Sequence, residues 1–474
     1  MKDEIFTIDT FKAALTPDDM LSGNFGVERE SLRAHADGQL ALTPHPAALG
    51  NKLTNAYVTT DFSESQVEIV TPPCPSVHEA YQTLGALTDM VNAVLPKDEY
   101  LWPNSIPCVL PDDKDIPVAR YAGAPGAEKA MQYRQNLVKK YGAKKQMFSG
   151  IHFNYSLGEE AVQKLFQSVR QNMPTLEYQD FKNRLYLKIA KNYLTYRWFL
   201  IFLTGASIAA HDTFMPSCLK LMPWSDDRGS HYSKKGISFR SGSPGYKNNE
   251  ALYPRYDSIA HFIDDLEGFV AQGKLSEPKE FYAQARLKPA HPKEDWLGSL
   301  KADGIRYIEI RTMDLNPFDP NGISELDMDI VHLLLLYCLL KPVIGENSDR
   351  KEADDNEWRV AEQGQDAFLV LHRNGEAILA KEWAREIVRD IGCMNRTLNL
   401  GKDAAVASMQ ARLGDVRVDH AAALVRLVED QGYVYGMSHL AKQYKAESLE
   451  RLQHPSGAYE ETLIRYKAAV PDLI

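Results

Sequence analysis

Two short segments of this chain place charged residues two positions apart and fill the gaps with apolar residues. Glu28 and Glu30 do so near the N-terminus, and Glu309 and Arg311 do so far along the chain. On a β-strand, side chains two positions apart share one face. A sheet face that collects carboxylates cannot be a dry core, because like charges repel and unpaired buried charges are costly. The pattern therefore predicts a sheet with one polar face.

A divalent cation would resolve the repulsion between these carboxylates. Mg²⁺ takes carboxylate oxygens and keeps room for substrate phosphates. His152 and Asn154 repeat the same two-residue spacing in a third segment. The usual phosphate signatures, GxxxxGK[ST] and a GxGxxG that follows a strand, are absent from the sequence. The first interpretation is a metal–nucleotide enzyme whose nucleotide is held through metal ions and scattered basic residues.

Bulk properties exclude several classes of partner and compartment. The formal net charge is -10 without a basic run, which argues against a nucleic-acid or anionic-membrane partner. The N-terminus lacks the basic-then-apolar pattern of a signal peptide, and the apolar stretch at 198–203 is too short to span a bilayer. The 5 cysteines are scattered, which is typical of reduced thiols in a cytoplasmic protein.

Periodicity divides the chain into a mixed part and a helical part. Alternation predicts strands at 23–33, 57–71, 148–157 and 305–313. Apolar spacing predicts helices at 76–95, 128–141 and 177–203, and another that is capped by Asp257 or Ser258 and ends near Gly273. The pattern from residue 323 is almost wholly helical, with amphipathic segments at 375–400, 417–433 and 435–469. We therefore expect a catalytic core over 1–325 and a helical region over 326–474 that packs on it.

A series of motifs in consistent order over residues 22–325 resembles bacterial glutamate–cysteine ligase. The matching segments are residues 26–33, 57–72, 101–107, 149–154, 205–207, 304–311 and 314–318. The chain looks most like the ligase module that some bacteria fuse to a downstream ATP-grasp glutathione synthetase. It ends at Ile474, too early for such a module. The expectation is a stand-alone ligase or a piece of the fusion.

The resemblance implies a fold and a reaction. The fold is α+β: a curved, largely antiparallel sheet forms a funnel of the glutamine synthetase-like superfamily, with helices outside and a helical C-terminal part. In the implied reaction, ATP phosphorylates the γ-carboxylate of L-glutamate, and the amine of L-cysteine attacks the acyl phosphate. This is the first step of glutathione biosynthesis. The implied cofactors are two or three Mg²⁺ ions, for which Mn²⁺ could substitute, and the favoured oligomeric state is a monomer.

The resemblance also assigns roles to the polar residues. Its metal ligands fall on Glu28, Glu30, Asp61, Glu68, His152 and Glu309. Glu309 and Arg311 would be catalytic, with Arg311 neutralising the transferring phosphoryl group, a task that suits a fixed planar cation. Without the resemblance, the carboxylates would be a solvated strand face, His152 a hydrogen-bonded core residue, and Glu309 with Arg311 an ordinary ion pair.

A cysteine pocket is implied in the same way. Tyr133 and Leu137 lie four apart and so share one helix face, for which core packing is the simpler interpretation. The resemblance adds these residues to the pocket: Gln146, Arg240, Tyr246 and Tyr282. Arg240 would pair with the cysteine carboxylate, because arginine binds carboxylates through two parallel hydrogen bonds. Arg286 matches without an assignable role, and Arg29, on the apolar face, is expected to need an internal anionic partner.

Two other functions remain open. A different carboxylate–amine ligase of the same superfamily would keep the metal face and accept another amine, which an acceptor screen would reveal. A non-catalytic metal- or nucleotide-binding relic would be expected to lose some of the carboxylates. All of them are present here, and titration with Mg²⁺-ATP in a coupled ADP assay would separate binding from turnover.

Overall fold

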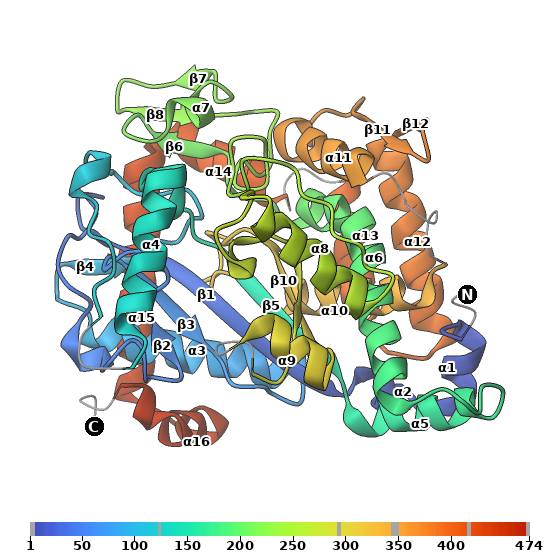
Figure 1. Ribbon diagram of the computed structural model, residues 1–474. Coiled ribbons are helices and arrows are strands. Elements are labelled where there is room, and N and C mark those ends of the chain that lie inside the picture. The colour runs from blue at the N-terminus through green and yellow to red at the C-terminus, as the bar shows by residue number, and fades with distance from the viewer. Residues whose placement is uncertain (1–4, 122–124, 292–294, 343–349, 415–418, 471–474) are drawn as a thin grey trace.

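A seven-stranded sheet forms the centre of the protein in the computed structural model, which describes residues 5–121, 125–291, 295–342, 350–414 and 419–470 (Figure 1). Its order is β2 (Val58–Thr59), β3 (Gln66–Val70), β1 (Gly23–His35), β5 (Ile151–Leu157), β10 (Tyr307–Met313) and β9 (Ala285–Lys288), and β4 (Glu99–Leu101) pairs with the end of β1. Every one of these pairings is antiparallel. The structure confirms the predicted α+β class with an antiparallel sheet.

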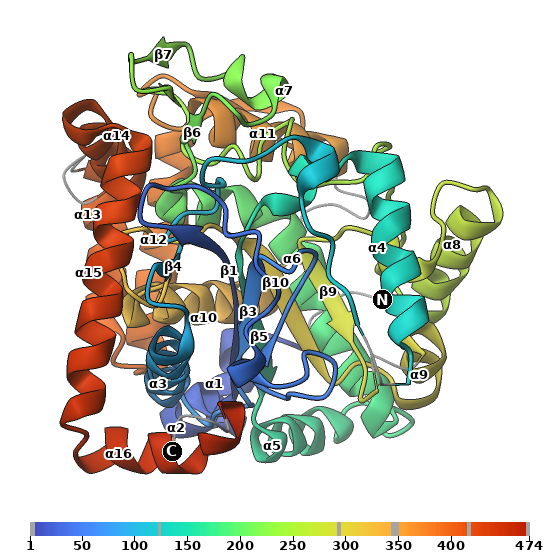
Figure 2. The same ribbon diagram turned by 90° about the vertical axis from the view of Figure 1, so that its left-hand side faces the viewer.

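The two faces of this sheet have different surroundings. Alternate side chains such as Val27, Phe153 and Ile308 are fully buried and form what we call the covered face. Three helices pack against the strands of this sheet: α3 (Val77–Val94), α6 (Tyr178–Thr204) and α10 (Glu325–Leu340). The intervening side chains form the open face. Figure 2 shows α3 and α10 on one side of the sheet and α4 (Ala127–Tyr141) on the other.

The helix boundaries predicted for the first part of the chain are confirmed within a few residues. α4 ends at Gly142, whose φ of 84° is unfavourable for other residues, after two lysines in the last turn. α8 (Ile259–Ala271) begins after Ser258, whose hydroxyl accepts the backbone N–H of His261.

The predicted strand over 57–71 is wrong in its middle. Only β2 and β3 are extended there, and residues 60–65 form the connection between them. The Thr60 hydroxyl donates to the carbonyls of Ser63 and Gln66, which folds the segment back on itself. This turn places Asp61 at the end of the sheet and leaves its side chain exposed.

The C-terminal part is mostly helical, as predicted. Its helices are α11 (Arg350–Gln363), α12 (Ala380–Thr397), α13 (Asp403–Gly414), α14 (His420–Gln431), α15 (Tyr433–Gln453) and α16 (Gly457–Arg465). The predicted helix over 375–400 is wrong at its start, because β11 (Val370–Arg373) and β12 (Glu376–Leu379) form a hairpin. Asn374 and Gly375 both have positive φ, as a tight hairpin turn requires. Residues 417 and 418 of the predicted helix over 417–433 lie outside the described residues.

Helix α15 packs along α3, at the edge of the molecule in Figure 2. Polar side chains of α15 hold the helix in this position through hydrogen bonds and an ion pair. The Tyr433 hydroxyl donates to the carbonyl of Ile106, and Arg451 forms an ion pair with Asp89. Lys445 donates to three backbone carbonyls, those of Leu95, Pro96 and Glu99. The C-terminal helices therefore share one hydrophobic core with the sheet.

The remaining elements complete the outer layer. They are α1 (Ile8–Ala14), α2 (Pro17–Leu21), α5 (Glu159–Arg170), α7 (Pro216–Leu219), α9 (Trp296–Asp303) and a small sheet of β6 (Ala209–His211), β8 (Ser230–Tyr232) and β7 (Trp224–Ser225). None of the described helices is both long and apolar enough to cross a membrane. All 5 cysteines are free thiols, and only Cys393 is exposed.

Arg29 has internal anionic neighbours, as expected, but it forms no direct ion pair with them in the described part of the chain. Its guanidinium is buried on the covered face and donates to the hydroxyls of Ser31 and Thr88 and to the carbonyl of Pro320. No ion pair involves it within the described part of the chain. Burial lowers the pKa of Arg29 to about 10, and the nearby charges of Asp319 and Asp89 oppose that shift, so the guanidinium stays charged at neutral pH.

Candidate functional site

Strand register brings the predicted polar residues of the open face side by side. Glu28 lies opposite His152, Glu30 lies opposite Glu68, and Glu309 lies opposite Asn154. Four strands thus contribute to one patch, although their residues are up to about 280 positions apart in sequence, as Glu28 and Glu309 show. The structure confirms the polar face that the two-residue spacing predicts.

Hydrogen bonds fix the carboxylates of β1 at defined positions. Glu28 accepts the side-chain amide of Asn154 at 2.9 Å, and its second oxygen lies 3.2 Å from His152 Nδ1. Glu30 accepts the backbone N–H of Gly150 at 2.7 Å. These donors come from β5 and the residue just before it, so β5 orients the acidic side chains of β1.

The open face concentrates negative charge where water is largely excluded. Burial first, and then the charges of Glu28 and Asp61, raise the pKa of Glu68 well above its usual range. Burial also raises the pKa of Glu30. Such crowding is unfavourable in the folded protein unless a cation is added.

Glu309 differs from the other carboxylates because cations already surround it. Its side chain is 0% exposed and forms ion pairs with Lys288 through one oxygen and with Arg311 through the other. Burial alone would raise the pKa of Glu309, but Lys288 and Arg311 hold it well below its usual range. Glu309 is therefore fixed as a carboxylate.

Two overlapping groups on this face match the ligand types that a metal ion takes. One consists of Glu28, His152 and Glu309, and the other of Glu30, Glu68 and His152. In each group the possible ligand atoms lie within 4.8 Å of one another. Carboxylate oxygens with one imidazole fit a hard or borderline divalent cation. Asp61 belongs to neither group, and its role as a ligand stays a prediction.

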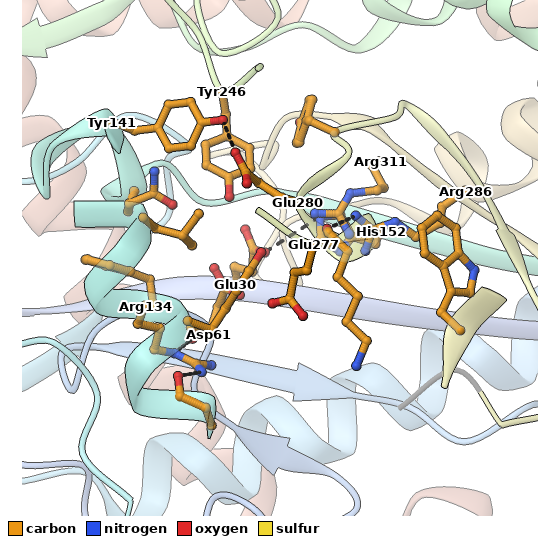
Figure 3. Close-up of a pocket in the computed structure, with 18 of the residues that line it drawn as sticks. Glu30, Asp61, Arg134, Tyr141, His152, Tyr246, Glu277, Glu280, Arg286 and Arg311 are labelled. Carbon is orange, nitrogen blue, oxygen red and sulfur yellow. Dashed lines mark hydrogen bonds and ion pairs between the residues drawn. The ribbon is translucent and has the colours of Figure 1, made fainter. Parts of the chain in front are cut away.

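A cavity of about 540 Å³ lies between the open face and α4. Figure 3 shows Glu30, His152 and Arg311 on its floor, with Tyr141 and Arg134 of α4 on one side and Arg286 on the other. Glu28, Glu68 and Glu309 are not among its lining residues. The cavity thus has a carboxylate-bearing floor and a wall that is supplied by a separate helix.

Every residue predicted for the cysteine pocket lines this cavity. They are Tyr133, Leu137, Gln146, Arg240, Tyr246 and Tyr282. The rings of Tyr246 and Tyr282 meet edge to face, with their centroids 4.6 Å apart. Gln146 Nε2 is buried without a hydrogen-bond partner, as expected of a donor that awaits a ligand. The helix-face argument for Tyr133 and Leu137 therefore holds, but the face points to a cavity and not to the core.

Arg240 is held by the backbone of β10. Its Nη1 donates to the carbonyls of Arg311 and Met313 at 3.1 and 3.3 Å, and its side chain is nearly buried. The guanidinium also lies against Gly150, where a Cβ atom would come within 2.1 Å of Nη2. Gly150 therefore has to be glycine for Arg240 to reach the cavity.

Sequence reasoning missed several charged residues around the cavity. Lys288 has no assigned role in the sequence, yet it contacts Glu309 directly. Arg286 lies opposite Glu309 on β9, and its guanidinium packs 5.6 Å from the centre of the Trp296 ring. Arg286 matches the family without an assigned role, and Lys288 lies two positions after it on the same strand, so the spacing rule that identified Glu28 and Glu30 could have found Lys288.

Arg134 was also missed, and it connects α4 with the turn that carries Asp61. Its guanidinium donates to the backbone carbonyls of Asp61 and Thr60 and lies over the ring of Tyr121. Lys129, Glu277 and Lys279 complete the charged rim of the cavity. Strand alternation does not mark these residues in the sequence, because Lys129 and Arg134 lie on α4 and Glu277 and Lys279 lie in the segment before β9.

Comparison with known proteins gives a consistent result. The family model described as glutamate-cysteine ligase matches residues 8–276 and 270–360. The glutathione biosynthesis bifunctional protein GshAB of Listeria monocytogenes is 37% identical over 443 residues, which are 90% of this chain and 55% of that protein. The protein of the same name from Clostridium perfringens is 35% identical and is covered over 54% of its length. The chain thus spans about half the length of these curated relatives.

Two solved structures are similar over nearly the whole chain. The glutamate–cysteine ligase from Francisella tularensis, solved in complex with AMP, has a TM-score of 0.81 at 25% identity and is matched over 95% of both chains. The bifunctional glutathione synthetase from Pasteurella multocida has a TM-score of 0.78 at 30% identity, with 95% of this chain and 55% of that one covered.

Proposed function

Because this chain belongs to the glutamate–cysteine ligase family, we propose that it joins the γ-carboxylate of L-glutamate to the amine of L-cysteine with ATP as the cosubstrate. The product would be γ-glutamylcysteine, formed through a γ-glutamyl phosphate in the first step of glutathione biosynthesis. The observation that carries the proposal is the cavity, in which a carboxylate floor for cations adjoins a pocket of tyrosines, glutamine and arginine.

We propose that the open face holds two or three Mg²⁺ ions, with Mn²⁺ as a substitute. Glu28, His152 and Glu309 would hold one ion, and Glu30 with Glu68 another, with Asp61 at the cavity edge as a further ligand. The crowded carboxylates on this face support the assignment. Bound ions would neutralise the charge of the triphosphate and bring it close to the glutamate carboxylate.

Arg311 would stabilise the phosphoryl group during transfer. Its guanidinium lines the cavity, and Glu309 fixes it from below. Burial opposes the positive charge, but Glu309 outweighs burial and raises the pKa of Arg311, so the side chain stays cationic. A preorganised cation of this kind is worth about 3 kcal/mol of barrier or more in transfer reactions.

The acceptor pocket would position the cysteine amine. Arg240 would bind the cysteine carboxylate, with Gln146 as an additional donor. Tyr133, Tyr246 and Tyr282 would surround the thiol side chain, and Leu137 would close the apolar side. A cysteine that is held at both ends leaves its amine free to attack the acyl phosphate.

Four further proposals concern the whole molecule. Residues 1–325 would form the catalytic core, and residues 326–474 a helical region that is packed on it. The chain would act either as a stand-alone ligase or as the ligase part of a longer protein. It would act as a monomer. A cytoplasmic location is supported by the 5 cysteines, which are all free.

The test is the release of ADP measured with glutamate alone, with cysteine alone and with both amino acids. We expect sustained release only with both, and formation of γ-glutamylcysteine in equal amount. Sustained turnover with another amine in place of cysteine would identify a different ligase of the same superfamily. Binding of Mg²⁺-ATP without any turnover would indicate the non-catalytic alternative and overturn the proposal.

A further inference from the structure

Lys288 occupies an unusual position at the edge of the carboxylate patch. It ends strand β9, shares the open face with Arg286 and Glu309, and its ammonium group forms an ion pair with Glu309 Oε2. Glu309 is also a member of the group with Glu28 and His152 that fits a metal ion. Lys288 and a bound divalent cation would therefore compete for the carboxylate of Glu309, since the ammonium group repels the cation.

The neighbouring cations have less freedom than Lys288. Arg311 Nη1 donates to Glu309 from the same strand, and its guanidinium also packs 5.6 Å from the centre of the Tyr282 ring. Arg286 Nη2 donates to the carbonyls of Lys279 and Phe281. Among the described residues, the one ion pair of Lys288 is with Glu309, although its charge also acts on nearby Glu28, and it carries that charge on a flexible stem.

The side chain of Lys288 also has space to move into the cavity. Its side chain lines the cavity and remains 15% exposed, whereas Glu309 is 0% exposed. A rotation about the lysine stem would carry the ammonium group from the carboxylate into the cavity without a backbone change. The cavity wall on that side already contains Arg286 and Arg311, so an anion bound there would meet three cations.

We propose that Lys288 is a positioning residue with two alternative partners. Without a divalent cation it closes on Glu309 and keeps that carboxylate neutralised. When a cation takes Glu309, Lys288 turns into the cavity and binds a polyphosphate. The inference rests on the proposed function for the identity of the anion, but the exchange at Glu309 requires only the cation. Lys288 would thus couple metal binding to nucleotide binding.

The test uses Lys288→Met in the full chain, because methionine keeps the stem and removes the charge. Isothermal titration with Mn²⁺ alone is expected to show affinity at least about fivefold tighter than in the unmodified protein, since the competing ammonium group is gone. Titration with a non-hydrolysable ATP analogue at saturating Mn²⁺ is expected to show affinity at least about fivefold weaker. The two opposite shifts distinguish an exchanging residue from one that only stabilises the fold, because a merely structural loss would weaken both.

Matched controls sharpen the result. Lys129→Met removes a lysine from the same cavity, but one that forms no ion pair with a carboxylate among the described residues, and it should leave Mn²⁺ binding unchanged. Lys288→Arg keeps the charge and should leave Mn²⁺ binding near that of the unmodified protein. Unchanged or weaker Mn²⁺ binding in Lys288→Met would overturn the proposal.

A second measurement avoids any substitution at Lys288. Acetylation of lysines in the unmodified protein, followed by mass spectrometry, should show Lys288 more reactive with Mn²⁺ alone and protected again when the ATP analogue is added. If the acetylation of Lys288 does not change when Mn²⁺ is added, the exchange is contradicted, even if Lys288→Met does not fold. Neither measurement requires turnover. If the ligase assay fails but the changes in Mn²⁺ affinity and Lys288 reactivity are observed, the proposed function is overturned and the exchange of Lys288 between its two partners is still supported.

Discussion

Buried charges have different partners on the two faces of the central sheet, and two adjacent residues of β1 illustrate the difference. Arg29, on the covered face, donates to three neutral oxygens and has Asp319 and Asp89 nearby to favour its charge. Glu28, on the open face, lies among other carboxylates and shares His152 with them. Charge on the covered face is thus balanced within the folded structure, whereas the open face also carries carboxylates, Glu30 and Glu68, whose pKa is raised by burial and whose charge a bound cation would favour.

This difference separates residues that stabilise the fold from residues that take part in binding or catalysis. Substitutions on the covered face should change the free energy of unfolding and leave the chemistry of the folded molecules intact. Substitutions on the open face should reduce binding or turnover and change the free energy of unfolding much less. Glu309 is an exception that the comparison explains, because its removal would also leave Lys288 and Arg311 without their anionic partner.

The largest expected effect is on stability and comes from Glu99→Gln. Glu99 on β4 forms a fully buried ion pair with Arg33 of β1. Breaking such a pair leaves an uncompensated buried charge and costs about 4 kcal/mol of unfolding free energy. Urea denaturation measures the loss. The rate per folded molecule should stay within about twofold of the unmodified protein, and a rate that falls with stability would erase the distinction between the faces.

Glu28→Gln applies the same chemical change to the open face. The amide keeps the size of the side chain and removes a cation ligand, so kcat should fall by about a hundredfold or more, or roughly 3 kcal/mol of barrier. The melting temperature should change less than in Glu99→Gln, because the amide oxygen of glutamine can still accept the hydrogen bond of Asn154. The measurement is ADP release at saturating Mg²⁺. Near-normal turnover would falsify the role of Glu28 as a metal ligand.

Arg240→Ala tests the part of the open face that would bind the acceptor. Loss of alignment should reduce kcat/KM for cysteine by about a hundredfold, because a small displacement of the amine weakens attack on the acyl phosphate. Binding of ATP and glutamate should be far less affected. Arg240→Lys is the control, since it keeps the charge and loses the planar fork. A raised KM for glutamate with an unchanged KM for cysteine would show that the pocket has been assigned to the wrong substrate.

The smallest predicted effect concerns pH and the covered face. His332 of α10 packs between Phe25 and Tyr155, with ring centroids 4.9 and 5.0 Å away. Burial lowers the pKa of His332 to about 3, whereas the unfolded chain titrates near pH 6.5. The unfolded state therefore binds the proton first, and stability falls as the pH drops from about 6.5 towards 3.

At pH 5 this histidine should account for about 2 kcal/mol of lost stability relative to neutral pH. His332→Leu should remove that part of the acid sensitivity, which denaturant titrations at pH 5 and 7.5 would measure. Activity at neutral pH should be preserved. An unchanged difference between the two pH values would mean that His332 is already protonated in the folded protein.

The sequence by itself determined the local features of this protein. Two-residue spacing predicted that Glu28, Glu30 and Glu309 lie on a polar strand face, because alternation on a strand is a property of the backbone. Capping chemistry predicted where α4 and α8 end and begin, because a glycine or a serine acts on its nearest peptide groups. The resemblance to glutamate–cysteine ligases gave the candidate residues, and the structure brings most of them to one cavity.

Only the tertiary structure decided which distant groups meet. The connection that carries Asp61, the placement of α4 over the open face and the pairing of Lys288 with Glu309 all depend on packing between segments far apart in the chain. The hydrogen-bond partners of Arg29 depend on it as well, since Thr88 lies on α3 and Pro320 in the loop before α10. Local propensity contains no term for such contacts, because their free energy exists only after the strands have paired and the helices have packed.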